Sequence, residues 1–459
     1  MPNSSKKFHQ KFCCLKNANE EKKMNIQEII AKKRDQQRLT KEEIAYFIQG
    51  YTKGEIGDEQ AAALVMAIYL NGMDEEEITD LTMEMAYSGD VLDLSRFGTV
   101  VDKHSTGGIG DKVTLILMPT IAALGVPVAK MSGRGLGYTG GTIDKLESIP
   151  GYQTGIAVED FIQNVEKIGI SLIGQTLNLA PADKKLYALR DTISCTESIP
   201  LIASSIMSKK IAAGASKIVL DVTCGSGAFM KKKEDAIALA KEMNQIGKLA
   251  KKETVCVLTN MEEPLGKAVG NSLEVIEAIE ALNGKMESDV EAVVTTLGAY
   301  MLKLAGKGND IQANQQEILS CIQSGKALKK FKELVANQGG DVSYIENPSQ
   351  FPKAEVILEV RAMQTGYVQE VKAEEIGRIS MLLGAGRKRK EDPIKPEVGI
   401  VLEKKVGDFV KEKEVLATIH AADWESAEKA KQEIQKIDRI VSEKVEKQPT
   451  ILGIVADEK

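Results

Sequence analysis

The feature that most constrains the fold is an alternation that begins after Arg96. From there to about residue 260, short apolar segments alternate with glycine-rich loops and helical patterns. Such alternation is typical of a mostly parallel sheet with helices on its faces, so the sequence predicts an α/β fold. The apolar segments are, in order, TVVDKH, TLILMPTIAAL, VPVAKM, ISLIGQ, KIVLDV and TVCVLT.

Two separated segments carry helical patterns instead. Over residues 39–88 apolar residues recur at helical spacing, with Thr40 in a capping position, and a second helical insert at 181–213 interrupts the α/β alternation. The sequence predicts that both segments build one helical domain. The predicted organisation is a disordered extension (1–23), the helical domain (24–90 and 181–213), the α/β domain (91–180 and 214–353) and a C-terminal α+β domain (354–459).

The C-terminal domain has strand-like patterns that begin near Ala362 and Val398. They predict the two halves of a small β-rich hybrid barrel. The second half resembles biotinyl and lipoyl carrier domains, but no Met-Lys-Met hairpin accompanies it, so we interpret it as scaffold.

Composition argues against several functions. The chain has 459 residues, 43% of them hydrophobic and 4% aromatic, and a net charge of −6. Few aromatic residues and no basic excess argue against nucleic-acid binding, whereas small anions remain possible ligands where cations are local. The six cysteines lack metal-ligand or disulfide spacing, and no apolar run reaches the roughly 18 residues of a membrane helix. These features predict a cytoplasmic protein without a membrane partner.

One glycine-rich stretch, residues 101–114 (VDKHSTGGIGDKVT), places Lys103 and His104 before three glycines. Consecutive backbone amides that open onto a helix make a concave donor site for phosphate, and Lys103 adds a point charge. The stretch does not fit the GxxxxGK[ST] loop. The alternative is a polar turn at the sheet edge, but His104 favours a site, because His9 and His420 lie in the extension and the C-terminal domain.

A second stretch, residues 130–147 (KMSGRGLGYTGGTIDKLE), matches a dinucleotide fingerprint at Gly135, Gly137 and Gly140. A lone match is weak evidence, and the alternative is a glycine-rich turn that supports packing. Two such loops about thirty residues apart, each leaving a strand, are expected to converge on one anion at the C-terminal edge of the sheet. Asp144 and Glu147 are expected to pair with Lys145 or Lys103 and to carry no chemistry.

A third stretch, residues 218–230 (IVLDVTCGSGAFM), offers a different function. It resembles the first motif of methyltransferases that use S-adenosylmethionine, which would be held at Asp221 and Gly225. Against this alternative, the next strand ends in Asn260 where such enzymes carry an acidic residue, and both earlier loops stay unexplained.

Four motifs in order resemble those of a known family. The stretches DKHSTGGIGDK, KMSGRGLGYTGGTIDKLE, LAPADKKLYALRD and SIPLIASSIMSKKIAAGA together resemble the bacterial pyrimidine-nucleoside phosphorylases, relatives of thymidine phosphorylase. The resemblance runs from about Met24 to the C-terminal domain. It implies a pentosyltransferase of pyrimidine salvage, in which inorganic phosphate attacks the anomeric carbon and releases free base and (deoxy)ribose 1-phosphate.

The same resemblance implies the site residues. For the base it implies Arg190, Ser205 and Lys209, with His104 near the O2 oxygen; His104, Arg190 and Lys209 would be catalytic, because cations stabilise the negative charge that the leaving pyrimidine gains. The base and phosphate ligands belong to different predicted domains, so domain closure must bring the substrates together. The implied phosphate ligands are Lys103, His104, Ser105, Thr114, Lys130, Met131, Ser132 and Thr142.

Without the resemblance, the residues alone favour purely structural roles for these cations. Arg190 would lie on a solvated helix face and pair with Asp183 or Asp191. Lys209 or Lys210 would be a helix-terminal cation favoured by the helix dipole.

Lys130 bears on substrate range. By resemblance, relatives that accept uridine as well as thymidine carry Lys there, whereas thymidine-restricted relatives carry Met. We therefore expect uridine, thymidine and deoxyuridine as substrates, with a thymidine-restricted enzyme as the alternative. The apolar run at residues 61–70 (AAALVMAIYL) favours a homodimer through the helical domain.

The sequence departs from the family pattern at two places. Thr223 and Cys224 replace a lysine and its neighbour. Some members hold a potassium ion between loop carbonyls and a glutamate, and here Lys112 replaces a threonine of that set, so its ammonium would repel the ion or substitute for it. The residues that match the potassium site are Gly110, Lys112, Leu265, Ala268 and Glu277.

Two further alternatives stay open. A catalytically silent sugar or nucleotide binding protein would bind its ligand without turnover. A phosphoribosyltransferase of the same plan would hold pyrophosphate and magnesium through acidic residues, and neither glycine loop contains such a cluster.

Overall fold

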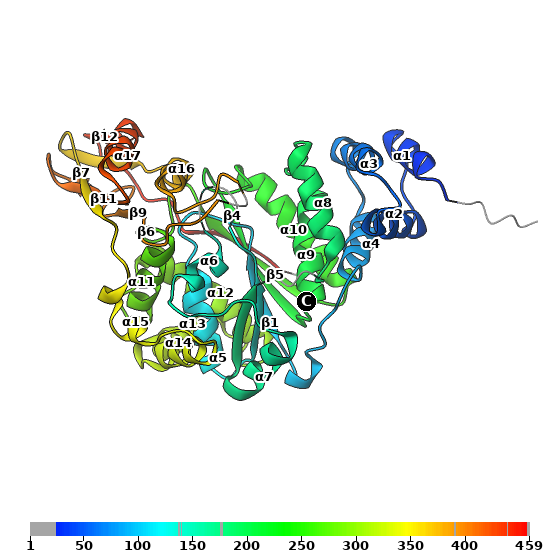
Figure 1. Cartoon of the computed structure of the whole chain (residues 1–459), viewed down its shortest axis with the longest axis horizontal. Helices are drawn as coiled ribbons and strands as arrows, with labels where there is room; N and C mark the ends of the chain where they lie inside the picture. Colours follow the sequence, from blue (N-terminus) through cyan, green and yellow to red (C-terminus); the bar gives the residue numbers. More distant parts are fainter. Residues whose placement is uncertain are drawn as a thin grey trace, which may run out of the picture.

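The computed structural model describes residues 24–135, 138, 140–174, 178–389, 392–437 and 439–456. The extension predicted at 1–23 and Gly137 of the second glycine loop lie outside these residues. Figure 1 shows a helical part at one end of the long axis, a central part built around strands, and a C-terminal part at the other end. No helix in the described ranges is long and apolar enough to cross a membrane.

The helical part combines two segments that are far apart in the sequence. Helix α8 packs against α2 and α4, and α9 packs against α4. Phe47 and Leu64 from the first segment belong to the same buried cluster as Leu186 and Leu201 from the second. Thr40 caps α2 with the expected capping box. The helices are α1 (Ile26–Arg34), α2 (Lys41–Lys53), α3 (Asp58–Asn71), α4 (Glu75–Ala86), α8 (Pro181–Thr192) and α9 (Ile199–Ala212).

The central part is a mostly parallel sheet, which confirms the predicted α/β class. β1 (Val101–Ser105), β4 (Lys217–Cys224) and β5 (Glu253–Asn260) run parallel in that spatial order. β2 (Val128–Ser132) and β3 (Ile170–Gly174) form a second parallel pair, and β2 contacts β1. The carboxyl ends of β1 and β2 carry the two glycine loops.

Helices surround these strands, and one of them comes from an apolar segment grouped above with the strands. TLILMPTIAAL lies in α5 (Val113–Ala123), where every residue from 113 to 122 is buried. A helix that is apolar all round is buried on all sides, so its sequence shows no amphipathic period. The other helices are η1 (Ser95–Phe97), α6 (Thr142–Glu147), α7 (Val158–Ile168), α10 (Lys233–Leu249), α11 (Asn271–Leu282), α12 (Ser288–Leu304), α13 (Ile311–Gln323), α14 (Lys326–Asn337), α15 (Ser343–Glu346) and η2 (Pro348–Gln350).

The C-terminal part is β-rich, but its described residues form no closed barrel, so the expected hybrid barrel is wrong in that respect. Its strands form two small sheets, ordered β6-β9-β11-β7 and β10-β8-β12, with α16 and α17 packed together. The elements are β7 (Val356–Arg361), β8 (Gly366–Glu370), α16 (Ala373–Leu383), β9 (Gly399–Leu402), β10 (Phe409–Val410), β11 (Val415–Ala421), α17 (Trp424–Ile437) and β12 (Arg439–Val441).

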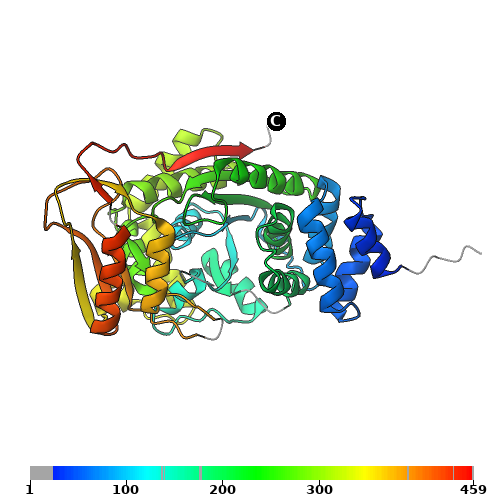
Figure 2. The ribbon, with the colours of Figure 1, turned by 90° about the horizontal axis from the view of Figure 1, so that it is seen from above.

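Two strands cross the boundary expected at residue 354. β6 (Ala268–Gly270), from the central segment, pairs with β9 of the C-terminal part. The last strand, β13 (Ile451–Ala456), returns to pair antiparallel with β5, and Figure 2 shows it lying over the central part. Pairing with β13 satisfies the backbone groups that β5 would otherwise expose at the sheet edge. The central and C-terminal parts are therefore interlocked.

Candidate active site

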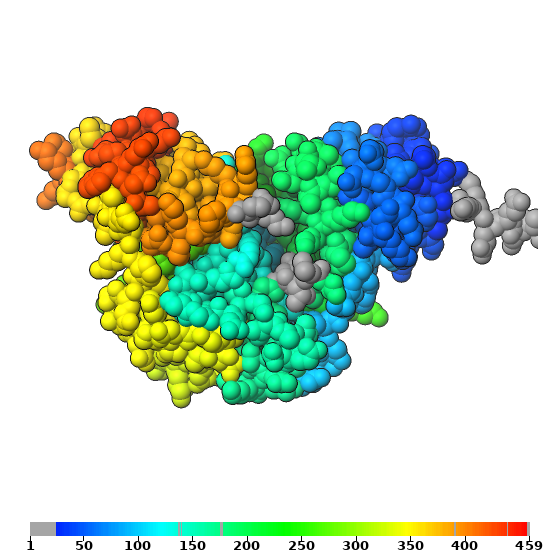
Figure 3. Space-filling view, in the orientation of Figure 1, coloured from blue at the N-terminus to red at the C-terminus, as the bar shows by residue number. Residues whose placement is uncertain are grey.

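The strands that lead into the two glycine loops, β1 and β2, lie beside each other. The Lys130 ammonium on β2 donates to the backbone carbonyl of Lys103 on β1 and lies 3.2 Å from Asp102 Oδ1. Figure 3 shows a recess in this region, between the orange and cyan segments on one side and the green segment on the other. β1 and β2 approach each other in one locality, around Lys103 and Lys130.

Asp102 is the anionic centre of this locality. Its carboxylate receives Lys130 on one oxygen and Lys210 on the other, with Lys210 Nζ 2.8 Å from Oδ2. All three side chains are buried. Burial raises the pKa of Asp102, but the two ammonium groups outweigh burial and hold it below the ordinary value. Burial lowers the pKa of Lys130 to about 8, although Asp102 opposes the shift.

His104 lies among these cations and is held neutral. Burial lowers its pKa well below the ordinary 6.5, and repulsion from Lys210, Lys130, Lys209 and Lys103 lowers it further. A neutral imidazole can donate one hydrogen bond without bringing a further positive charge into the cluster.

Lys103 is the most deeply buried of the cations. Its ammonium lies 3.4 Å from Asp221 Oδ2 and 3.7 Å from Asp111 Oδ2. It makes no hydrogen bond of good geometry within the described part of the chain. Burial raises the pKa of Asp221, although Lys103 opposes that shift. An ammonium with charge partners but with unused donors is suited to an anion.

The remaining phosphate candidates occupy strand ends and helix starts. Ser105 ends β1 and accepts a 3.2 Å hydrogen bond from the Gly107 amide. Met131 offers its carbonyl to Lys210 Nζ at 3.4 Å, and Ser132 ends β2. Thr114 lies in the first turn of α5, and Thr142 is the first residue of α6.

The second glycine loop is closed by Asp144, not left open. Asp144 Oδ2 accepts from the amides of Gly135 and Gly141, each at 2.8 Å. The expectation that Asp144 and Glu147 pair with Lys145 or Lys103 is wrong, because both carboxylates pair with Arg134. Lys145 instead lies 2.7 Å from Glu274 on α11 and donates to the Asp111 carbonyl at 2.7 Å.

Across the recess, α8 and α9 bring together Ser205, Lys209 and Asp183. Lys209 Nζ lies 2.7 Å from Ser205 Oγ and 2.6 Å from Asp183 Oδ2. The Lys209 side chain keeps 22% of its surface exposed, so its ammonium can meet a ligand.

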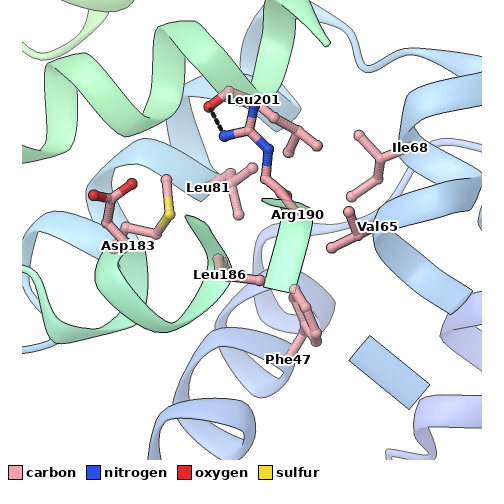
Figure 4. A pocket seen from close by; sticks show the side chains of 9 residues that line it. Phe47, Val65, Ile68, Leu81, Asp183, Leu186, Arg190 and Leu201 are labelled. Carbon is pink, nitrogen blue, oxygen red and sulfur yellow. Dashed lines mark hydrogen bonds between the residues drawn. The ribbon is translucent and has the colours of Figure 1, made fainter. Parts of the chain in front are cut away.

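Arg190 does not lie on a solvated helix face. It is buried, and its guanidinium donates to the carbonyls of Cys195, Thr196 and Leu201 at 2.8–3.0 Å. The solvated-face reading is therefore wrong, and no hydrogen bond or ion pair joins Arg190 to Ser205 or Lys209 in the part of the chain that the structure describes. Figure 4 shows Arg190 in a mostly apolar pocket, where its guanidinium is hydrogen-bonded to the Leu201 carbonyl. Asp183 lies on the other side of this pocket.

The five residues matched to a potassium site do come together, but Lys112 fills their centre. Its ammonium lies 2.7 Å from the Leu265 carbonyl, 3.2 Å from the Ala268 carbonyl and 2.7 Å from Glu277 Oε2. Gly110 adjoins the same carbonyls. The residues present therefore do not fit a potassium ion.

The methyltransferase alternative finds no support at the third glycine stretch. Asp221 is buried and accepts from Thr259 Oγ1 at 2.7 Å. A Cβ on Gly225 would lie 2.6 Å from the Glu262 amide, and one on Gly227 would lie 2.5 Å from Ala373 Cβ. The backbone and α16 thus occupy the space beside these glycines. Thr223, at the departure from the family pattern, lies 2.9 Å (Oγ1 to Oγ1) from Thr106 of the first loop.

Sequence reasoning missed Asp102 and Arg387 and gave Lys210 only a helix-terminal role. Arg387 donates to Asp144 Oδ1 at 2.8 Å and to the Gly135 carbonyl at 3.2 Å. Asp102 directly precedes Lys103 and Lys210 directly follows Lys209. Their charges, next to predicted ligands, were a local signal that could have identified them. Arg387 had none, because its partners lie 243 and 252 residues away in the chain.

Three family models match successive parts of the chain. One described as the glycosyl transferase family helical bundle domain matches residues 27–89, and one described as the glycosyl transferase family a/b domain matches residues 98–328. A pyrimidine nucleoside phosphorylase C-terminal domain matches residues 367–441. Among solved structures, the anthranilate phosphoribosyltransferase of Thermus thermophilus shares the fold, with a TM-score of 0.56 and 19% identity over 69% of this chain and 99% of that one.

Relatives of much higher identity cover nearly the whole chain. A pyrimidine-nucleoside phosphorylase of Staphylococcus haemolyticus is 54% identical over 91% of this chain and 96% of its own length. A pyrimidine-nucleoside phosphorylase of Geobacillus stearothermophilus is 51% identical over 94% of this chain and 99% of its own length. With this identity and coverage, the chain belongs to the pyrimidine-nucleoside phosphorylase family.

Proposed function

We propose that this chain is a pentosyltransferase that cleaves pyrimidine nucleosides with inorganic phosphate, giving the free base and (deoxy)ribose 1-phosphate. The observation that carries the proposal is a buried cluster of lysines around Asp102, on the strands that lead into the glycine loops, with Ser205 and Lys209 close by on α9. This arrangement offers one site for an anion and a second, facing site for a base.

The phosphate site of the proposal lies on β1, β2 and the first turns of α5 and α6. Lys103 would supply positive charge. The hydroxyl groups would come from Ser105, Ser132, Thr114 and Thr142. The N-terminus of α5 favours an anion at this position through its dipole. The phosphate would be held as the nucleophile, and its oxygen would attack the anomeric carbon on the face opposite the base. Lys130, His104 and Met131 complete the set.

The base site of the proposal lies on α9. As the glycosidic bond breaks, the pyrimidine gains negative charge, so a cation directed at it stabilises the transition state more than the ground state. Lys209 would take this role, oriented by Asp183, with Ser205 hydrogen-bonded to the ring imide. Neutral His104 would donate to O2 without repelling the neighbouring ammonium groups.

Arg190 would contact the base only after a change in its hydrogen bonds. To touch the base, its guanidinium would have to exchange a backbone carbonyl of the 195–201 segment for a pyrimidine oxygen. Such an exchange fits a closing movement of the helical part toward the phosphate loops, which would also exclude water from the sugar.

The proposed substrates are uridine, thymidine and deoxyuridine. The Lys130 ammonium, next to the phosphate loops, would donate a hydrogen bond to a ribose 2′-hydroxyl and would also tolerate a deoxyribose. The potassium ion implied by resemblance has no role in this proposal, because the Lys112 ammonium lies among the oxygens that would hold it.

We also propose a homodimer through α3, where Met66, Tyr69 and Leu70 expose 37%, 39% and 72% of their surfaces. Light scattering should show a dimer that Leu70→Glu weakens.

A cytoplasmic location is proposed from four buried free cysteines at 195, 224, 256 and 321.

The function is tested by incubating the purified protein with uridine, thymidine, deoxyuridine and cytidine, with and without phosphate, and measuring free base. Phosphate-dependent release of uracil and thymine supports the proposal. Release of thymine alone would overturn the broad range inferred from Lys130. Folded protein that releases no base would overturn the reaction itself.

A further inference from the structure

The Lys112 ammonium is enclosed in a small oxygen cage between the first glycine loop and the segment that precedes α11. Lys112 precedes α5 directly and its side chain is fully buried. Its three partners are the carbonyls of Leu265 and Ala268 and the carboxylate of Glu277 on α11. The ammonium donates hydrogen bonds to the two carbonyls and forms an ion pair with the carboxylate.

The cage is closed around that group. A Cβ on Gly266 would lie 2.2 Å from Glu277 Oε1 and 2.7 Å from Lys112 Nζ. A Cβ on Gly110 would lie 2.5 Å from the Leu265 carbonyl oxygen. Both glycines have positive φ, +67° and +78°, so the backbone is folded tightly around the ammonium. A second cation there would also meet the unscreened charge of Lys112.

The cage also fixes the position of the 264–268 segment, because lysines from two different parts of the chain donate hydrogen bonds to its carbonyls. Lys112 holds it from the side of the phosphate loop. Lys405, from the C-terminal part, donates to the carbonyls of Pro264 and Gly266 and lies 2.6 Å from Asp289 Oδ2. Glu277 also accepts from the amides of Lys267 and Ala268 at 2.9 and 2.7 Å. The position of the first glycine loop is therefore tied to the C-terminal part through Lys112.

We infer that the Lys112 side chain is a tethered replacement for a monovalent cation in this cage, so that the fold and the phosphate loop of this chain need no potassium. Two carbonyl oxygens and a carboxylate form a set that a bare monovalent cation would also satisfy, and an ammonium carries the same single charge. Because the lysine is covalently attached, the cage keeps its cation at any salt composition.

The test compares wild type with Lys112→Thr and Lys112→Met at constant ionic strength, in potassium chloride or in tetramethylammonium chloride, whose cation is too large for the cage. Thr opens space and supplies an oxygen. Met keeps the length of lysine without charge, so it fills the cage and blocks an ion. The readouts are Tm and the KM for phosphate, and the first does not depend on the proposed reaction.

Wild type should show the same Tm and KM in both salts. Lys112→Thr should lose roughly 5 °C or more in tetramethylammonium, because Glu277 loses its buried partner, and should regain most of this loss as potassium is added. Lys112→Met should be destabilised in both salts, without rescue.

A wild-type Tm that falls when potassium is removed would overturn the inference. So would a Lys112→Thr protein whose Tm ignores potassium, or a Lys112→Met protein that potassium rescues. If Lys112→Thr folds only in potassium, refolding yield against potassium concentration replaces Tm as the readout, and a yield without potassium dependence contradicts the inference.

Discussion

Lys209 and Asp183 form an ion pair of 2.6 Å between α9 and α8, and the same ammonium lies 2.7 Å from Ser205 Oγ. One carboxylate thus fixes the direction of the cation proposed to meet the base. Lys209→Ala should lower kcat/KM for uridine about 100-fold or more, because the charge that stabilises the leaving base is lost. Steady-state kinetics measure this change. The matched control is Lys184→Ala, an exposed lysine of α8, and an equal loss in both variants would contradict the role of Lys209.

Asp102 carries the counter-charge for two buried ammonium groups, those of Lys130 and Lys210. Asp102→Asn should lower the free energy of unfolding by about 3–5 kcal/mol, because removing one partner leaves uncompensated buried charge. Denaturant unfolding measures the change. Asp191→Asn, at an exposed position of α8, is the control and should have little effect. A loss below about 1 kcal/mol, typical of a surface pair, would show that Asp102 does not hold the lysines.

Lys130 should give phosphate use a pH dependence. Burial lowers its pKa to about 8 from an ordinary 10.5, so it loses its charge as pH rises through about 8. kcat/KM for phosphate should fall over that range. Lys130→Arg should move the fall to higher pH, because a guanidinium stays charged. An unmoved profile in Lys130→Arg would assign the fall to another group.

The same shift affects stability in the opposite direction. Between pH 8 and 10.5 the unfolded chain binds more protons at Lys130 than the folded chain does. The contribution of Lys130 to the free energy of unfolding therefore rises with pH across that window. Activity and stability should diverge above pH 8, and thermal unfolding measured beside kinetics checks this.

Much of the site was predictable because its residues belong to local patterns. Lys103, His104, Lys130 and Ser132 lie at the ends of apolar segments, and strands that run parallel bring their carboxyl ends to one edge. The buried helix α5 was harder, because an apolar segment without a period fits a strand or a helix.

Adjacent lysines show what the sequence could not decide. Neighbouring residues on a helix point about 100° apart, so Lys209 faces Asp183 on α8 while Lys210 faces Asp102 on β1. The sequence shows two basic residues in a row, but the direction of each depends on how α9 packs against α8 and the sheet. The Arg190 contacts likewise depend on the turn between α8 and α9, which no periodic pattern describes.

Arg387 links the C-terminal part to the second glycine loop, and its loss should weaken phosphate use more than folding. Its guanidinium lies 2.8 Å from Asp144 Oδ1, and it donates to the Gly135 carbonyl at 3.2 Å. Arg387→Ala would leave Asp144 with Arg134 and the two loop amides, so the loop would persist but shift. Because a displacement of about 1 Å in a binding loop can cost up to about 100-fold, we expect KM for phosphate to rise about 10-fold or more. Tm should change little. Kinetics with phosphate varied at saturating uridine measure the effect, with Arg389→Ala, an exposed arginine two residues further along, as the control. A large fall in Tm without a change in KM would mean that Arg387 serves the packing of the C-terminal part, not the loop.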